Sequence, residues 1–210
     1  MPDSKPTIVP LDRSRLGDAA KLLADAFYED PMASYMIPEE HNRHDGLRRM
    51  MRRCLSYGML YGRVETTEDL EGVAAWIPPK YVKFNFFRLL RSGMIIVPWI
   101  LGRAAAKRFS QAMSDAGRLH AKHAPGRHWY LFILAVAPNA QRRGVGTTLM
   151  EHGLARIDGQ NLPCYLETSS QKNVEYYPRH GFEMREKTTV AGGSLGVWAF
   201  LRQPGKTKAD

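Results

Sequence analysis

The chain contains short apolar runs separated by segments in which apolar residues recur every three or four positions. The run 131–136 is short, rich in strand-forming residues and followed by a Pro-Asn turn, which predicts a buried strand. Beyond a turn that holds Gly144 and Gly146, apolar residues recur at helical spacing over 145–157. We therefore expect a strand that leads through a glycine-bearing turn into a helix.

The same criteria locate the other regular elements. Strands are predicted over 7–9, 62–67, 72–77, 164–168, 183–190 and 194–201, and helices over about 13–28, 47–58 and 173–180. Asp12 suits the N-cap of the first helix, and Pro178 is expected to shorten the last one. The segment 28–45 contains two X-Pro breaks and is predicted to be irregular.

The segment 81–124 is apolar with interspersed arginines. Its unbroken part, 92–102, is 11 residues long and contains Pro98, whereas a helix that spans a bilayer needs about 20 apolar residues. No transmembrane span is expected, and two helices with a bend near Pro98 are predicted instead. Packing on the sheet, covering a binding pocket and lying on a membrane surface are the roles left open for this segment.

The turn after the central strand suits a pyrophosphate. The first N–H groups of a helix have no partner within it and carry partial positive charge, and glycine lets a ligand approach the backbone closely. Arg142 and Arg143 add two full charges. An ordinary connection with solvated arginines is the alternative.

Two common nucleotide-binding turns fit less well. The G-x-x-x-x-G-K-[ST] loop is absent. A dinucleotide-binding turn would use Gly144 and Gly146, with Glu167 as the later carboxylate, but Leu149 replaces the third glycine. Only 43 residues follow Glu167, too few to complete such a sheet.

The motif Q-R-R-G-V-G after the apolar strand resembles the signature of the GCN5-related N-acetyltransferase (GNAT) superfamily, and 165–182 resembles its later motif. The sequences L-E-T-S and N-V-E-Y-Y-P-R-H-G-F are similar to the branch that includes puromycin N-acetyltransferase. The resemblance implies one α/β (α+β) domain over 1–205 with a polar tail at 206–210. It implies a mixed, mostly antiparallel sheet of six to seven strands, splayed at its centre, with helices on both faces and a helical insertion at about 78–125.

The implied reaction is direct transfer of acetyl from acetyl-CoA, a cosubstrate, to a primary amine of a small molecule. The implied coenzyme contacts are Leu134, Ala135, Val136, Gln141, Arg142, Arg143, Gly144, Val145, Gly146, Thr147, Asn173 and Tyr177. The Val136 N–H is expected to meet the negative charge that develops on the carbonyl oxygen.

Two side chains are candidates for proton transfer. Glu167 is the candidate base, because it ends a strand beside the expected cleft, although a structural carboxylate or a water chain is an alternative. Tyr177 lies where the family's proton donor falls, four residues before Gly181, and the adjacent Tyr176 competes for that assignment.

The first two helices are expected to form one wall of the acceptor site. Four nearby carboxylates are candidates to attract a cationic amine: Glu29, Asp30, Glu39 and Glu40.

Composition narrows the remaining possibilities. The chain has 210 residues and a formal charge of +9, and the segment 77–127 alone holds ten basic residues and one acidic residue. A solvated helical face explains this charge most simply, so no nucleic-acid partner is expected, although a non-catalytic nucleic-acid-associating or CoA-binding module is an alternative. Cys54 and Cys164 lie in apolar patterns and are expected to be buried free thiols, and no histidine spacing predicts a metal site. A cytoplasmic monomer or homodimer is expected, with peptide or protein acetylation as the alternative activity.

Overall fold

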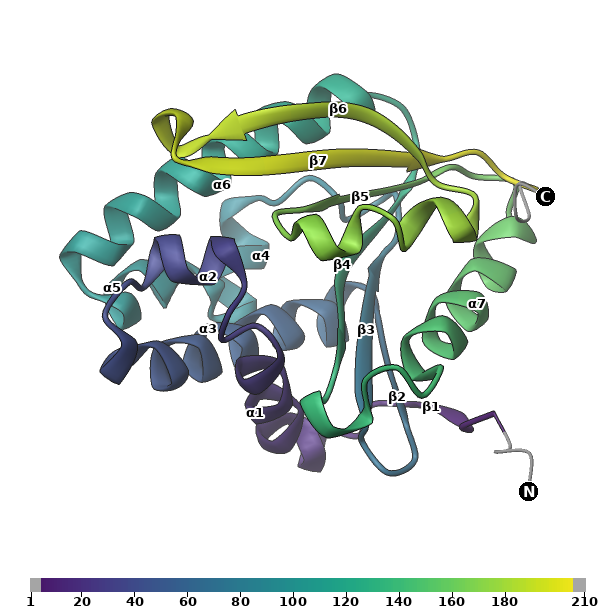
Figure 1. Ribbon diagram of the computed structural model, residues 1–210, viewed down its shortest axis with the longest axis horizontal. Coiled ribbons are helices and arrows are strands. Elements are labelled where there is room, and N and C mark those ends of the chain that lie inside the picture. The colour runs from purple at the N-terminus through teal and green to yellow at the C-terminus, as the bar shows by residue number, and fades with distance from the viewer. Residues whose placement is uncertain (1–4, 206–210) are drawn as a thin grey trace.

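A computed structural model describes residues 5–205 and shows one seven-stranded sheet with the order β1-β2-β3-β4-β5-β7-β6 (Figure 1). The strands are β1 (Ile8–Pro10), β2 (Arg63–Thr67), β3 (Gly72–Ile77), β4 (Trp129–Val136), β5 (Cys164–Thr168), β6 (Glu183–Val190) and β7 (Leu195–Arg202). The pair β4–β5 is parallel and the other pairs are antiparallel. The expected mixed, mostly antiparallel sheet is thus confirmed. The tail expected at 206–210 lies outside the described residues.

Seven α-helices accompany the sheet within residues 5–205: α1 (Leu16–Ala26), α2 (Pro31–Met36), α3 (Glu40–Tyr61), α4 (Phe86–Ser92), α5 (Val97–Leu101), α6 (Arg103–His123) and α7 (Val145–Asp158). The prediction of irregular structure over 28–45 was wrong, because α2 and the start of α3 occupy it. Pro31 lies in the first turn of α2, where its missing N–H costs no helical bond, and Asp30 Oδ1 accepts the Met32 N–H at 2.9 Å. Asp12 does form a cap, since its Oδ1 accepts the Ser14 N–H at 2.7 Å, but it caps a 3-10 turn (Arg13–Arg15) that leads into α1, and α1 itself begins after Arg15 with no side-chain cap.

The insertion differs from the prediction of two helices bent at Pro98. It contains α4, a 3-10 turn (Met94–Ile96), α5 and α6. The breaks fall at Gly93 and Gly102, whose φ angles are 73° and 82°, in a region that other residues rarely adopt. Pro98 instead lies in the first turn of α5. Within residues 5–205 no helix combines the length and the apolar character needed to cross a bilayer.

The helix expected over 173–180 is replaced by two 3-10 turns, Gln171–Asn173 and Tyr177–His180. Pro178 opens the second turn, and Gly181 ends it with a φ of 80°. Proline therefore limits this segment to short turns, as its position suggested. The last two strands form the predicted hairpin around a 3-10 turn at Ala191–Gly193.

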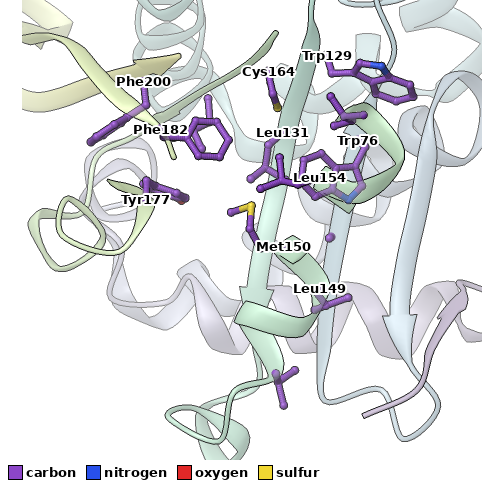
Figure 2. Close-up of a cluster of buried hydrophobic side chains, with 14 of the residues drawn as sticks. Trp76, Trp129, Leu131, Leu149, Met150, Leu154, Cys164, Tyr177, Phe182 and Phe200 are labelled. Carbon is purple, nitrogen blue, oxygen red and sulfur yellow. The ribbon is translucent and has the colours of Figure 1, made fainter. Parts of the chain in front are cut away.

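Helices cover both faces of the sheet. The α7 side forms one core with Trp76 of β3, Trp129 of β4 and Phe200 of β7 (Figure 2). The α1 side packs on Val73 and Ala75, the alternate residues of β3. Both thiols are free, as expected, and Cys164 is buried in the first core, whereas Cys54 is only half-buried beside the second.

The two central strands diverge from a short region of pairing. β4 pairs with β3 from Tyr130 to Val136 but with β5 only at Trp129–Cys164 and Tyr130–Tyr165. Figure 1 shows β4 and β5 separating beyond that point. One edge of β4 is therefore open to a ligand along most of its length, and the predicted splay is present.

A bulge in β4 determines which backbone groups face this opening. Ala75 pairs with Ile133 but Trp76 pairs with Leu131, so Phe132 is an extra residue in the strand. Trp129 donates its N–H to Pro163 on the β5 side, whereas Ala137 donates to Glu71 on the β3 side, each at 2.8 Å. In a regular strand the N–H groups of residues 129 and 137, eight positions apart, would point to the same side. The bulge therefore reverses the direction of the backbone groups that follow it. The backbone groups of residues 134 and 136 consequently face the gap.

Close packing of α7 on the sheet depends on Gly153. A Cβ there would lie 2.2 Å from Cε2 and Cζ2 of Trp76, which is fully buried. We expect Gly153→Ala to lower the free energy of unfolding by about 1–3 kcal/mol, because the indole must move within a filled core. Gly117→Ala on α6 is the control, since its Cβ would meet nothing within 4 Å. Equal urea midpoints for the two variants would contradict this account of the α7 packing.

Candidate active site

The turn between β4 and α7 has the geometry of an anion site. Gly144, with a φ of 83°, precedes α7, and the first helical hydrogen bond runs from Thr148 N–H to Gly144 O at 2.9 Å. The N–H groups of residues 145–147 therefore have no carbonyl partner in the helix. A Cβ on Gly144 would meet nothing within 4 Å, so the space beside this backbone is open. The residues expected to hold a pyrophosphate thus lie together at a helix N-terminus.

The two arginines of the turn have different surroundings. Arg143 Nη1 lies 2.9 Å from Glu71 Oε1, which ties it to the turn before β3. Arg142 has a φ of 64° and is exposed, and it makes no ion pair within residues 5–205. Arg142 is therefore the more available cation for a bound phosphate.

The open edge of β4 meets this turn directly. Residues 134 and 136 direct their backbone toward the gap, whereas Ala135 faces β3 with its backbone and buries its side chain. Gln141 Nε2 donates to the Val136 carbonyl at 3.3 Å. A Cβ on Gly146 would lie 3.3 Å from Val136 Cγ2. The structure thus brings Leu134, Val136, Gln141 and Gly146 together, and the backbone of Ala135 is turned away.

Glu167 lies on β5 at the other side of the splay. Its Oε1 accepts the Tyr130 hydroxyl at 2.6 Å, and its buried Oε2 has no hydrogen-bond partner in the described chain. Burial raises the pKa of Glu167 to about 7, although the nearby hydroxyls of Tyr130 and Tyr165 act in the opposite direction. A carboxylate with this pKa can accept a proton near neutral pH.

Tyr177 is placed by packing against the α7 side of the core. Its ring centroid lies 5.4 Å from that of Phe200 and 6.0 Å from that of Phe182, and Figure 2 shows the three rings side by side. Only 7% of the residue is exposed. Burial raises the pKa of its hydroxyl, and the charges of Asp30 and Glu167 contribute in the same direction. Tyr177 therefore stays protonated at neutral pH and lies within electrostatic range of the candidate base.

Tyr176 and Asn173 line the same region. The Tyr176 Oη would lie 3.5 Å from a Cβ on Gly146, and it is buried without a hydrogen-bond partner in the described chain. Burial raises the pKa of Tyr176 to about 12. Asn173 Nδ2 donates to Thr168 Oγ1 at 3.5 Å, at the end of β5. Both neighbouring tyrosines therefore remain candidates for proton donation.

A cavity of about 1510 Å³ opens beside Glu167. Its walls come from the end of α1, from α2 and α3, and from the insertion, so the first helices do line a pocket. Of the four carboxylates singled out in the sequence, Asp30 lines the cavity. Its Oδ1 accepts the Ser169 hydroxyl at 2.9 Å, and burial raises its pKa. Glu39 instead lies 3.7 Å from Arg108 Nη2.

Aromatic and histidine side chains that no sequence motif indicated surround the candidate base. His128 donates Nδ1–H to Gly126 O at 2.7 Å, so its Nε2 accepts from His120 Nε2 at 2.7 Å. Burial and then His128 lower the pKa of His120 to about 3, which keeps it neutral. The pairing of Tyr130 with Tyr165 places Glu167, two residues further along β5, on the face of Tyr130. Tyr130 could therefore be identified from the sequence once this pairing was known. His120 could not, because it lies on α6 and no local pattern places that helix against the site.

The titratable groups do not form a metal site in the described chain. Across residues 5–205, no three His, Cys, Asp or Glu side chains converge in a way that would hold a metal ion.

The chain is similar in sequence to known acetyltransferases. The sequence model of the Acetyltransferase (GNAT) family matches residues 86–182. An uncharacterized N-acetyltransferase of Schizosaccharomyces pombe, C550.08, is 27% identical over 172 residues, covering 78% of this chain and 69% of the relative.

Solved structures share the fold. A structure of histone acetyltransferase HPA2 and related acetyltransferase from Corynebacterium glutamicum has a TM-score of 0.71 and 23% identity, covering 98% of this chain and all of that one. The C-terminal condensation domain of Ebony, solved with β-alanyl-dopamine, has a TM-score of 0.62 and 12% identity, covering 95% of this chain and 99% of that one.

Proposed function

We infer that this chain belongs to the GNAT superfamily and transfers the acetyl group of acetyl-CoA directly to a primary amine of a small molecule. One observation carries the proposal: the open edge of β4 lies between the unpaired N–H groups at the start of α7 and Glu167, whose Oε2 is buried and whose pKa is raised to about 7. Such an arrangement serves a ligand that is anionic at one end and reactive at the other.

The residues of the turn and of β4 fit the coenzyme. The N–H groups of residues 145–147 and the Arg142 side chain would hold its pyrophosphate. The backbone of Leu134 and Val136 would bond the amides of its pantetheine arm as a neighbouring strand does. Acetyl-CoA supplies an activated acyl group when bound. The Val136 N–H faces the gap and can donate to an oxygen on which negative charge develops.

Two side chains then handle protons. Glu167 Oε2 is the proposed acceptor of a proton from the amine, because it is buried, lines the cavity and has no internal partner. The Tyr177 hydroxyl is the proposed donor to the departing thiolate. Its raised pKa makes it a weak acid, so donation depends on a thiolate destabilised by the same apolar surroundings.

The walled cavity supports a small-molecule acceptor over a peptide or protein. Helices α2 and α3 and the insertion surround the approach to Glu167, and an extended chain would have to pass between them. The ligand of the Ebony domain, β-alanyl-dopamine, shows that this fold accommodates a small amine conjugate in another protein. Kinship with the puromycin N-acetyltransferase branch, a cytoplasmic location and a monomeric or homodimeric state stay predictions from the sequence.

The test is thiol release from acetyl-CoA in the presence of a panel of primary amines and lysine-containing peptides. We expect release with small amines, matched by acetylated product, and slower release with peptides. Faster release with peptides would reverse the choice of acceptor. Release with no acceptor, combined with salt-sensitive binding of a nucleic-acid probe, would favour a non-catalytic module.

A separate prediction concerns Arg142. Arg142→Gly removes the cation while suiting the φ of 64°, so the fold should be kept. We expect the Kd for acetyl-CoA to rise about 10- to 100-fold, because a charge-assisted contact is lost, and the effect to shrink as salt is added. Isothermal titration calorimetry measures it, with Arg49→Ala on an exposed part of α3 as the equal-charge control. Equal affinities for the two variants would remove Arg142 from the coenzyme site.

A further inference from the structure

The cavity beside Glu167 is larger than a short amine needs. Its volume of about 1510 Å³ exceeds the range of about 300–1,000 Å³ that is usual for small-molecule sites. It extends from β4 and β5 outward between α3 and the insertion, as far as Trp99, which is 76% exposed. An acceptor that fills this space has an extended body in addition to its amine.

The wall chemistry is mostly apolar. Six of the chain's ten methionines line the cavity: Met32, Met36, Met50, Met51, Met94 and Met113. Aromatic rings complete the wall, among them Phe84, Phe109 and Phe132. Methionine side chains are flexible and polarizable, so they adapt to apolar surfaces of different shape. Walls of this kind favour hydrocarbon or aromatic groups, which gain by leaving water.

Charged groups in the cavity are arranged by sign. The acidic side chains, Asp30 and Glu167, are partly buried where the cavity meets β5. The basic side chains Lys80, Lys83 and Arg127 are exposed to solvent. An ammonium group is attracted to the inner acids, whereas a second cation further out would meet apolar walls and basic side chains. This pattern fits one positive charge on an apolar body.

We propose that the acceptor is a primary amine carried on a large apolar body, alkyl or aromatic, with its nitrogen at Glu167 and its body between α3 and the α4–α6 insertion. The chemistry rests on the proposed acetyl transfer, whereas the binding of an apolar body can be tested independently. The insertion, which forms much of the apolar wall, would bind that body.

The test measures kcat/KM with acetyl-CoA for butylamine, hexylamine, octylamine and decylamine. Each added methylene should raise kcat/KM by about fourfold until the chain reaches the mouth of the cavity. Octanediamine, which has the length of octylamine and a second cation, should react at least tenfold less efficiently than octylamine. Values that stay flat or fall with chain length, or a preference for the diamine, would overturn the proposal while leaving acetyl transfer intact.

A matched pair of variants locates the effect. Met113 lines the cavity and is 41% exposed, whereas Met184 on β6 is 50% exposed and lies outside it. Met113→Glu should flatten the dependence of kcat/KM on chain length, whereas Met184→Glu should keep the wild-type dependence. Identical profiles for the two variants would contradict the assignment to this cavity.

Equilibrium binding distinguishes the proposal of an apolar acceptor cavity from the proposal of acetyl transfer. Isothermal titration of the amines without acetyl-CoA should show affinity rising with chain length in the wild type and less so in Met113→Glu. If this rise occurs but no amine is acetylated, the cavity proposal stands and the proposed transfer fails. If affinity does not depend on chain length, the cavity proposal fails whatever the turnover.

Discussion

Replacing Tyr177 by Phe is expected to reduce kcat by about a hundredfold or more, with the Kd for acetyl-CoA unchanged. The ring, which packs on Phe182 and Phe200, is retained, so the α7 core should keep its stability. The hydroxyl alone is lost, and with it the proposed proton donor to the departing thiolate. Steady-state kinetics and calorimetric binding on the same preparation measure the two quantities.

Tyr176→Phe is the matched control for this prediction. Tyr176 is adjacent in sequence and half-buried, and its buried hydroxyl lies near Gly146 rather than within the packed rings. It should change kcat by much less than Tyr177→Phe. Turnover lost in Tyr176→Phe and kept in Tyr177→Phe would transfer the donor role to Tyr176.

Glu167→Gln is expected to reduce kcat/KM by about 100- to 10,000-fold, because the amide cannot accept the amine's proton. In the wild type, kcat/KM should rise with pH through about 7, as Glu167 loses its own proton. That step should be absent from the residual activity of the variant, while any rise from deprotonation of the amine at higher pH remains. A profile that keeps its step near pH 7 would exclude Glu167 as the titrating base.

The same carboxylate has a predictable effect on stability. Its folded pKa is raised, so the folded state keeps a proton that the unfolded state has already lost between about pH 4.5 and 7. Stability is therefore lost as the pH rises through this window, and a charged, buried carboxylate remains above it. Glu167→Gln should unfold no more easily than the wild type at pH 8, which shows that its lost activity is not lost folding.

Tyr130→Phe tests the positioning of the base. The Tyr130 hydroxyl donates to Glu167 at 2.6 Å and lowers its pKa. Without it, the step in the pH profile should move to higher pH, and activity should recover at alkaline pH. A variant that lost activity equally at every pH would show a purely structural role for Tyr130.

The strand, the turn and the following helix were predictable because their signals are local. The apolar run, the Pro-Asn turn and the paired glycines lie within one continuous stretch, and the structure begins α7 at Val145, the first residue of the predicted helical pattern. The continuously apolar sequence of β3 also has a direct structural meaning, since its alternate residues pack on opposite faces of the sheet and all six are buried.

Three features of the site depend on tertiary contacts and were not predictable from local signals: the orientation of the β4 backbone, the helix starts at prolines and the cavity. The orientation of Leu134 and Val136 depends on the bulge at Phe132, which becomes visible only when β3 and β4 are paired. The starts of α2 and α5 were not predictable from Pro31 and Pro98, because proline opens a helix as readily as it interrupts one. The cavity depends on how α4–α6 pack against α3, which no local pattern encodes.

The most direct measurement is a crystal structure of the protein with bound CoA. The account predicts the pyrophosphate on the N–H groups of residues 145–147, the pantetheine arm along the open edge of β4, and the sulfur between Glu167 and Tyr177. A coenzyme bound elsewhere, or a turn at Gly144 left without phosphate while the arm avoids β4, would contradict it.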